Sequence, residues 1–226
     1  MSKVNMVSVV IPTLNEAGTI GRTIKLLKKE VRYPHEIIVV DGNSTDETQE
    51  IVRNAKCRLI IEPKRGYGVA LKTGIKHAKG DVVVIVDGDG TYELKDVNKL
   101  IDALIGENAQ LCLGARMNGL YDKSMDIANY VGNRIVTFVF NLLYKQKLID
   151  SQSGFRVIKR SVLKKVELFE GDMAFATEML VKFVKRGFKI VEVSTSYKPR
   201  TYGKSKLKRI KAGLEIFKVL IRGIKD

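Results

Sequence analysis

The first hundred residues alternate short apolar runs with segments of helical periodicity. The apolar runs are rich in valine and isoleucine, and they are VSVVIP (7–12), EIIVVDG (36–42), CRLIIE (57–62) and DVVVIVDGDG (81–90). Between them, residues 19–29 and 45–54 carry apolar side chains at helical spacing. Strands that are apolar on both faces and alternate with helices indicate a parallel sheet covered on both sides. We therefore predict an α/β fold with a mostly parallel sheet flanked by helices.

After residue 110 the pattern changes. The run LCLGAR (111–116) predicts another strand, and residues 125–147 form a long, mostly helical segment with aromatic residues through its centre. The uncharged core of this segment, residues 135–144, is about half of the ~20 apolar residues that span a bilayer. The sequence leaves two interpretations open, a buried helix and an interfacial helix.

The charge is unevenly distributed. The 226 residues carry a formal net charge of +15, and nine basic residues against two acidic ones lie from Arg200 onward. Apolar side chains in this tail recur every three or four residues, at Leu207, Ile210, Leu214, Phe217, Ile221 and Ile224. We predict a basic amphipathic helix over residues 206–226. Such a helix can lie on an anionic membrane surface, and packing on the protein's own core is the alternative.

Polar clusters follow three of the predicted strands. They are PTLNE (12–16), DGNSTD (41–46) and DGDGTY (87–92). In parallel sheets the ligand site lies beyond the carboxyl ends of the strands, where neighbouring loops converge. We expect these clusters to form one rim.

Asp87 and Asp89 point to the same side if the chain stays extended through Gly88. Their repulsion can be relieved by a shared proton, a neighbouring cation or a divalent metal ion. Hard oxygen ligands so few in number suit Mg²⁺ or Mn²⁺, completed by water and phosphate oxygens. A solvated turn is the alternative, because aspartate and glycine are common in turns.

Six segments together resemble a family 2 glycosyltransferase of the GT-A fold, and more narrowly the catalytic domain of dolichol-phosphate (polyprenyl-phosphate) mannose and glucose synthases. The segments are VSVVIPTLNE, IIVVDGNSTDET, RGYGVALKTGIKHAKGD, VIVDGDGTY, DSQSGFRVIKR and ATEMLVKFVKRGFKIVEVSTSYKPRTYGKSKL. The resemblance covers nearly the whole chain and makes residues 1–205 the catalytic domain. It implies inverting transfer of a hexose from GDP-mannose, UDP-glucose or UDP-N-acetylglucosamine to a polyprenyl phosphate.

The resemblance also assigns residues to the donor. Asp87 and Asp89 would hold Mg²⁺ or Mn²⁺ on the diphosphate. The residues implied to surround the nucleotide sugar are Pro12, Leu14, Glu16, Asp41, Arg65, Gly66, Gly68 and Asp87. Glycine suits this task because it lets backbone approach a ligand closely. Many relatives have glutamine where this chain has Thr91, and a water molecule could then complete the metal ligands.

The acceptor decides which side chains catalyse the transfer. A sugar hydroxyl needs a general base, for which Glu178 is the candidate, whereas a lipid phosphate is already anionic and needs cations. Arginine suits phosphate because its planar fork donates two parallel hydrogen bonds. The cationic candidates are Arg116, Arg134, Arg156, Arg200 and Lys206. We predict Asp89, Arg116, Glu178 and Arg200 as catalytic, with Arg134 and Lys206 on the acceptor phosphate and Glu178 orienting sugar hydroxyls or cations.

Three other functions fit parts of the sequence. Transfer to a soluble or polysaccharide hydroxyl is the main alternative, and nucleotidyl transfer is a more distant one. Nucleic-acid binding would explain the charge but leaves the three polar clusters unexplained, and no helix-turn-helix or zinc-finger pattern is present. We therefore expect no nucleic-acid partner.

The sequence also bears on location. Cys57 and Cys112 lack metal-ligand spacing, which favours a reduced, cytoplasmic setting. Many relatives continue into transmembrane helices that are absent from this sequence. We expect a lipid acceptor to be reached at the cytoplasmic face, through peripheral binding to an anionic membrane or through a membrane partner protein.

Overall fold

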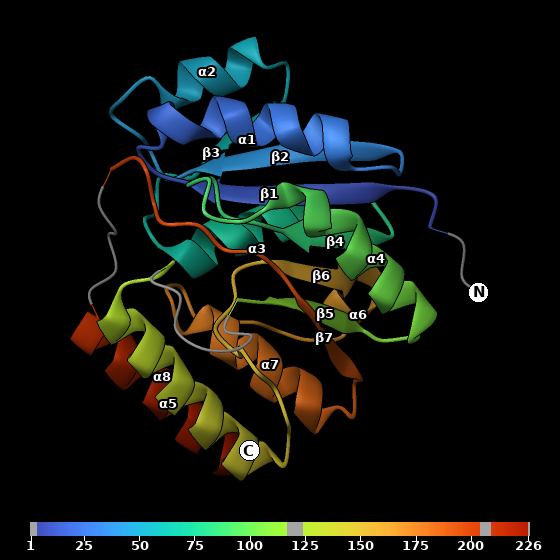
Figure 1. The fold of residues 1–226 in the computed structure, drawn as a ribbon, viewed down its shortest axis with the longest axis vertical. Coiled ribbons are helices and arrows are strands. Elements are labelled where there is room, and N and C mark those ends of the chain that lie inside the picture. The colour runs from blue at the N-terminus through green and yellow to red at the C-terminus, as the bar shows by residue number, and fades with distance from the viewer. Residues whose placement is uncertain (1–3, 117–123, 204–208, 226) are drawn as a thin grey trace.

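The described residues form one seven-stranded sheet. The computed structural model describes residues 4–116, 124–203 and 209–225 (Figure 1). The strands are β1 (Val7–Thr13), β2 (His35–Asp41), β3 (Arg58–Ile61), β4 (Val82–Ile85), β5 (Leu111–Ala115), β6 (Arg156–Lys159) and β7 (Ile190–Ser194), in the order β3-β2-β1-β4-β6-β5-β7. Strand β6 is antiparallel to both of its neighbours, and the other pairings are parallel. The predicted mostly parallel sheet is confirmed.

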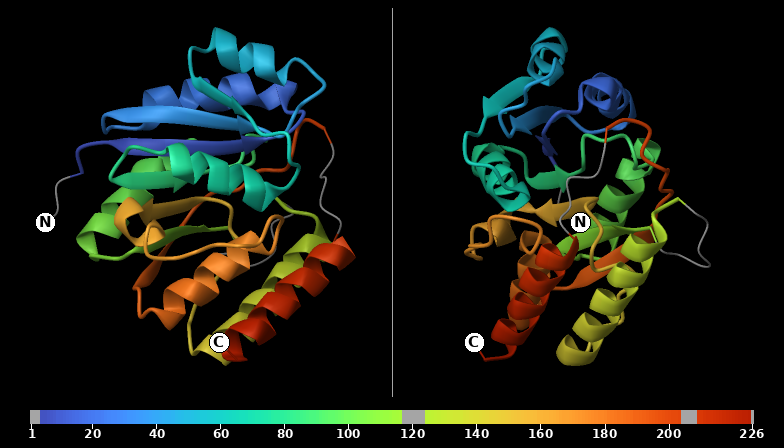
Figure 2. Two further views of the ribbon diagram at one scale, coloured as in Figure 1. Left: turned by 180° about the vertical axis from the view of Figure 1, so that it is seen from behind. Right: turned by 90° about the vertical axis from the view of Figure 1, so that its left-hand side faces the viewer.

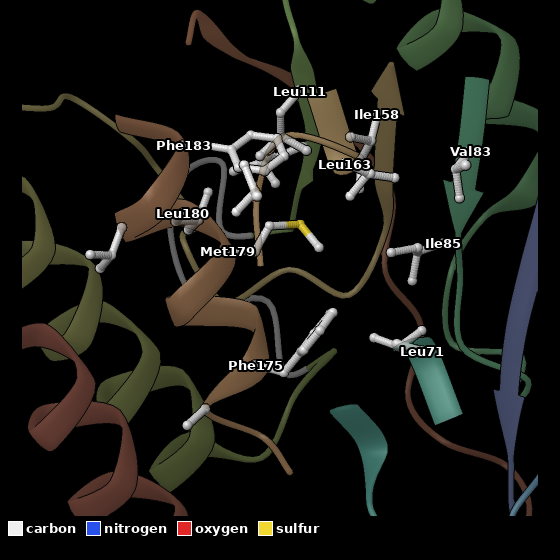
Figure 3. Packing of buried hydrophobic residues seen from close by; sticks show 14 of the residues in the cluster. Leu71, Val83, Ile85, Leu111, Ile158, Leu163, Phe175, Met179, Leu180 and Phe183 are labelled. Carbon is white, nitrogen blue, oxygen red and sulfur yellow. The ribbon is translucent and has the colours of Figure 1, made fainter. Parts of the chain in front are cut away.

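Helices cover both faces of this sheet. They are α1 (Ala17–Glu30), α2 (Thr48–Asn54), α3 (Tyr67–His77), η1 (Leu94–Asp96), α4 (Val97–Gly106), α5 (Ile127–Tyr144), α6 (Arg160–Leu163), α7 (Phe175–Lys185) and α8 (Arg209–Lys225). Strand side chains alternate between two hydrophobic clusters: Val9 and Ile11 pack with α1 and α4, whereas Val10 and Ile85 pack with α3 and α7. Figure 3 shows the second cluster, in which Leu71, Phe175 and Phe183 meet the sheet.

The strand order positions the site. Strand β1 lies between β2 and β4. Strands β2 and β3 extend the sheet on one side of β1, and β4 begins the other side, so the strand order reverses at β1. In such sheets a crevice opens at the carboxyl ends where the order reverses. The register pairs Thr13 with Asp41 and Val10 with Ile85, which brings the polar segments after β1, β2 and β4 to the same edge.

Helix α8 lies against α5 and α7 (Figure 2). It packs through Ala212, Ile216, Val219 and Leu220, all of them buried. An added Cβ at Gly223 would lie 2.3 Å from the Val181 side chain of α7, so the absence of a side chain there permits the close approach. The apolar stripe that the sequence predicted is a different set, and its described members, Ile210, Leu214, Phe217, Ile221 and Ile224, are exposed. The helix therefore packs on the core through one face and presents the predicted stripe outward.

Helix α5 occupies most of the segment predicted at 125–147. Asp126 caps it by accepting hydrogen bonds from the Ala128 and Asn129 amides at 3.0 and 3.4 Å. Only one side of the helix is buried, through Val136, Thr137 and Phe140. The helix is therefore half-buried: one side packs on the core, and the other side is exposed. Among the described helices, none combines the length and the apolar character needed to cross a bilayer.

Candidate active site

Asp87 and Asp89 lie just beyond the carboxyl end of β4, which pairs with β1. The turn that carries them is fixed from both sides: the Thr19 hydroxyl donates to the Gly88 carbonyl at 2.8 Å, and Gly90 adopts a φ of 73°. The Thr91 amide and hydroxyl donate to Asp89 Oδ1 at 3.1 and 2.7 Å. Thr91 is buried and therefore orients Asp89 instead of facing the crevice.

Arg200 joins three of the predicted site segments. Its Nη1 donates to Asp89 Oδ2 at 3.1 Å, and its Nη2 forms an ion pair with Glu16 at the start of α1. Its Nε donates to the Tyr202 carbonyl at 2.7 Å, which holds the guanidinium in place. Residues 16, 89 and 200 are far apart in the sequence, and one cation brings them together at the rim.

Asp87 is less well compensated than Asp89. Its hydrogen bond within the described residues comes from the Tyr67 hydroxyl, at 3.1 Å from Oδ1. Burial, and then the neighbouring Asp89 carboxylate, raise the pKa of Asp87 to about 7. Burial also raises the pKa of Tyr67 well above its usual value, so the phenol stays protonated and continues to donate. Asp87 is therefore the carboxylate of the pair whose negative charge is least compensated by the protein.

The donor set at this pair fits a small divalent cation. Asp87 Oδ2 lies beside Gly154, where an added Cβ would come within 2.6 Å of that oxygen. No cluster of three or more His, Cys, Asp or Glu side chains forms a metal site among the described residues. Mg²⁺ and Mn²⁺ bind through few carboxylates and complete their coordination with water and substrate phosphates. Two neighbouring carboxylates match that requirement, and the absence of a side chain at Gly154 leaves Asp87 Oδ2 free of a clash.

The glycine-rich loop packs against the chain's own backbone. Gly66 has a φ of 146°, and an added Cβ there would lie 2.2 Å from the Gly171 carbonyl oxygen. At Gly68 the corresponding distance to the Glu170 carbonyl oxygen is 2.6 Å. The Val69 amide donates to that Gly171 carbonyl at 3.0 Å. These glycines make room for the segment 170–171, and the loop delivers Tyr67 to Asp87.

Glu178 anchors the segment that covers this loop. Its Oε1 and Oε2 accept from the Phe169 amide at 2.9 and 3.0 Å, and Oε2 also accepts from the Glu170 amide at 2.9 Å. Lys182 donates to Oε1 at 2.7 Å, and the carboxylate is buried. Both carboxylate oxygens are therefore engaged by the protein itself.

Arg116 is paired behind the rim. Its Nε and Nη2 donate to the two oxygens of Asp150 at 2.6 and 2.9 Å, and its guanidinium lies 5.4 Å from the centre of the Tyr197 ring. Asp150 is fully buried, so this bidentate pair is shielded from water. Two of the donors that we expected to face phosphate are used within the fold.

Asp41 organises the loop that follows β2. It accepts from the Ser44 amide and from Gln49 Nε2, both at 2.8 Å, and it is fully buried. Leu14 lies 3.8 Å from the position of a Cβ added at Gly42, so the ends of β1 and β2 are in contact. Pro12 is buried within β1 opposite Val40. These residues form the floor of the predicted nucleotide side of the rim.

The remaining cationic candidates lie apart from this cluster. Arg65 is exposed before α3, and Arg134 is exposed on α5. Arg156 is buried and donates to the carbonyls of residues 151, 153 and 176 at 2.8–3.1 Å. Lys206 lies outside the described residues. The structure thus joins Glu16, Asp89 and Arg200 directly, whereas among the described residues no hydrogen bond or ion pair joins Arg65, Arg134 or Arg156 to them.

Four neighbours of the predicted residues were missed by sequence reasoning. Tyr67 and Gly154 flank Asp87, Asp150 compensates Arg116, and Tyr197 lies under the same guanidinium. The sequence offered two signals: Tyr67 lies between two glycines, and Asp150 directly precedes the SQSGFR run. Neither signal names its partner, because the partners lie 20 to 81 residues away in the sequence.

Comparisons with known proteins bear on this arrangement. A family model described as glycosyl transferase family 2 matches residues 8–167. The chain is 34% identical over 221 residues to the glycosyltransferase AglJ of Haloferax volcanii, a match that covers 97% of this chain and 72% of that protein. It is 30% identical over 215 residues to a dolichyl-phosphate hexose transferase of the same organism, covering 95% and 92% of the two chains.

Solved structures share the fold. One is glucosyl-3-phosphoglycerate synthase from Mycobacterium tuberculosis in complex with Mn²⁺, UDP-glucose and phosphoglyceric acid, with a TM-score of 0.78, 20% identity, and coverage of 98% of this chain and 80% of that one. Another is mannosyl-3-phosphoglycerate synthase from Rubrobacter xylanophilus, with a TM-score of 0.80, 16% identity, and coverage of 97% and 74%. At these identities the likeness shows the fold alone.

Proposed function

Because the chain belongs to glycosyl transferase family 2 and has the GT-A fold, we propose that it transfers a hexose from a nucleotide-diphosphate sugar to a polyprenyl phosphate, with inversion. The observation that supports a phosphate acceptor is that the Glu178 carboxylate is already hydrogen-bonded within the protein. Both of its oxygens accept hydrogen bonds from backbone amides, and Lys182 holds one of them. An acceptor that is already anionic needs no general base, whereas a hydroxyl acceptor does.

The donor side rests on Asp87 and Asp89. A bound Mg²⁺ or Mn²⁺ would supply positive charge against the donor diphosphate as it leaves. Asp87, which Tyr67 orients, would contribute the oxygen beside Gly154, and Asp89 is held in place by Thr91. The similarity to a dolichyl-phosphate hexose transferase supports the polyprenyl acceptor.

Arg200 would serve the leaving group. It lies at the rim between two acids, at 22% side-chain exposure, and its planar guanidinium can exchange a carboxylate partner for a phosphate oxygen. Preorganised positive charge at the departing diphosphate lowers the barrier because it costs no reorganisation during the reaction. We propose that this reaction occurs at the cytoplasmic face of a membrane.

The test is a matrix of donors and acceptors. Purified protein with Mn²⁺ is incubated with labelled GDP-mannose, UDP-glucose or UDP-N-acetylglucosamine, and with a short water-soluble polyprenyl phosphate, 3-phosphoglycerate or no acceptor. We expect label in the prenyl phosphate product with one donor, and loss of that product when EDTA removes the metal. Label in the phosphoglycerate product alone would refute the proposal.

A variant separates the two acceptor classes. Replacing Glu178→Gln keeps the side-chain shape but removes the charge that three amide contacts and Lys182 stabilise. Under the proposal the variant loses only a few-fold in turnover. Complete loss of turnover with unchanged donor affinity would assign Glu178 as the base for a hydroxyl acceptor.

A further inference from the structure

Helices α5 and α8 carry most of the exposed large apolar side chains. Of the fifteen such residues in the described parts of the chain, eleven lie on these two helices. We call ten of them the α5–α8 platform: Ile127, Val131, Ile135, Phe138 and Leu142 on α5, and Ile210, Leu214, Phe217, Ile221 and Ile224 on α8. Exposed apolar patches of this extent are uncommon on monomers and mark interaction surfaces.

The two halves of the platform are adjacent. The Tyr144 hydroxyl donates to the Leu220 carbonyl at 2.6 Å, and the two helices share the buried cluster that contains Phe140 and Ile216. On each helix the exposed stripe recurs every three or four residues, away from the residues that pack inward. Figure 2 shows α5 and α8 lying next to each other at one edge of the molecule. Phe138 and Leu142 are 67% and 68% exposed, and Ile210 is 83% exposed, so these side chains meet water.

Basic side chains border the platform. Lys211, Lys218 and Arg222 lie on the exposed side of α8, next to its apolar stripe, and Arg134 is the one charged residue of α5. Two of these basic groups have acidic neighbours: Lys211 lies 3.7 Å from Glu215 of the same helix, and Arg222 pairs with Glu170 at 2.8 Å. The two helices together therefore expose apolar and positively charged groups with almost no negative charge.

We propose that the α5–α8 platform docks on an anionic lipid bilayer, with its apolar side chains at the level of the headgroups and its lysines on the lipid phosphates. Apolar area and basic charge on the same face are the combination that favours such a surface. A second copy of this chain fits less well. Helix α8 has five basic residues against one acidic residue, and α5 has one basic residue, so two platforms in contact would bring an excess of positive charge together.

The platform lies near the site. Figure 1 shows the first turns of α5 and α8 on the side of the sheet toward which β1 runs, and both helices extend away from it. A bilayer on the platform would then border the rim that holds Asp89 and Arg200. That a bilayer there would bring a lipid acceptor to the rim rests on the proposed function. Docking on the bilayer can be measured without donor or acceptor.

The experiment is flotation of the full chain with vesicles that contain no polyprenyl phosphate. Neutral phosphatidylcholine vesicles are compared with vesicles that contain about 30% phosphatidylglycerol, at low and high salt. We expect binding to the anionic vesicles, weaker binding at high salt, and weak binding to neutral ones. Binding to neither vesicle would overturn the proposal.

Two pairs of variants make the test specific. Phe138→Gln with Leu142→Gln removes apolar contacts, and Ile61→Gln, at 45% exposure on β3, is its control. Lys211→Glu with Lys218→Glu reverses charge beside the platform, and Lys25→Glu with Lys29→Glu, exposed on α1, changes the net charge by the same amount. We expect each platform variant to lower the vesicle partition coefficient by at least about tenfold, with the controls little changed.

Two further measurements complete the design. Light scattering over a range of concentrations measures self-association, and a concentration-dependent dimer that the platform variants abolish, without vesicle binding, would assign the platform to a second copy and refute lipid docking. Thermal melting verifies that every variant is folded. Transfer to a water-soluble prenyl phosphate, measured in parallel, fails only if the proposed function is wrong, so the two failures are distinguishable.

Discussion

The rim and the α5–α8 platform depart from the usual distribution of side chains in opposite directions. At the rim, charged groups are buried, and Asp41, Glu178 and Asp150 each receive several hydrogen bonds that offset the loss of hydration. On the platform, apolar side chains remain in water with nothing to offset their exposure. Asp87 is the exception at the rim, because burial and the neighbouring Asp89 raise its pKa. Incompletely compensated charge and exposed apolar surface are both unfavourable for the isolated molecule, and both are therefore places where a ligand or partner is expected.

The largest expected effect is on transfer. Asp87→Asn removes one of the two carboxylates at the crevice and should lower kcat/KM by about 10²–10³-fold, because charge stabilisation at the leaving group is lost. Asp102→Asn, in the exposed ion pair with Arg32, is the control and should leave transfer unchanged. Steady-state kinetics with the donor measures both. Equal activity of the two variants would remove Asp87 from the site.

The buried ion pair should dominate stability at the rim. Arg116→Met leaves Asp150 buried without its partner and should lower the free energy of unfolding by about 3–5 kcal/mol. Arg32→Met breaks an exposed pair of the same length, 2.6 Å, and should cost less than about 1 kcal/mol. Urea denaturation followed by circular dichroism compares them. Similar losses in the two variants would contradict the buried geometry.

Two phenylalanines on one helix test the platform. Phe140 is fully buried and Phe138 is 67% exposed, although they are two residues apart on α5. Phe140→Ala should destabilise the protein by about 3–5 kcal/mol through the cavity it leaves. Phe138→Ala should change stability by less than about 0.5 kcal/mol. A large loss from Phe138→Ala in the absence of lipid would show that something of the chain itself covers the platform.

Asp87 should also make stability depend on pH. Its pKa is raised to about 7 by burial and by Asp89, above the value of about 4 expected in the unfolded chain. The carboxylate therefore destabilises the metal-free fold fully above pH 7, and this penalty fades as the pH falls toward 4. Asp87→Asn should raise Tm more at pH 8 than at pH 5, which thermal melting in EDTA can measure. An equal shift at both pH values would show that the pKa of Asp87 is not raised.

The smallest effect should come from the loop anchor. Glu178→Asp shortens the side chain that holds the amides of residues 169 and 170, which cover Gly66 and Gly68. We expect a two- to fivefold rise in KM for the donor with kcat little changed, since about 1 kcal/mol of hydrogen bonding is lost. Glu167→Asp, nearby on the same segment, is the control. A drop in kcat alone would indicate direct contact with the reacting groups.

The position of the site could be predicted from the sequence, because strand ends determine which polar segments meet. Asp41, Asp87 and Glu16 each follow a buried apolar run, and the parallel register brings them to one edge. The partners of these residues could not be predicted. Arg200 reaches Glu16 across 184 residues, and Arg116 reaches Asp150 across 34, and no local periodicity encodes either contact.

The C-terminal helix shows a second limit of sequence patterns. Helical spacing correctly grouped Ile210, Leu214 and Ile221 on one face, but Ile216 and Leu220 form another apolar face of the same helix. Which face packs inward depends on the positions of α5 and α7, where Gly223 allows close approach to Val181. Tertiary geometry, which a one-dimensional pattern does not contain, made that choice.

Arg200 has a consequence for how the molecule is assembled in the cell. Because its guanidinium pairs with both Asp89 and Glu16 and offsets part of their charge, the acidic cluster has a resident counterion before any metal arrives. The chain can therefore fold in a metal-poor environment and keep the crevice in shape. Under the proposed function, binding of the donor diphosphate would require Arg200 to exchange a carboxylate partner for a phosphate oxygen, so that one arginine would respond to occupancy of the rim.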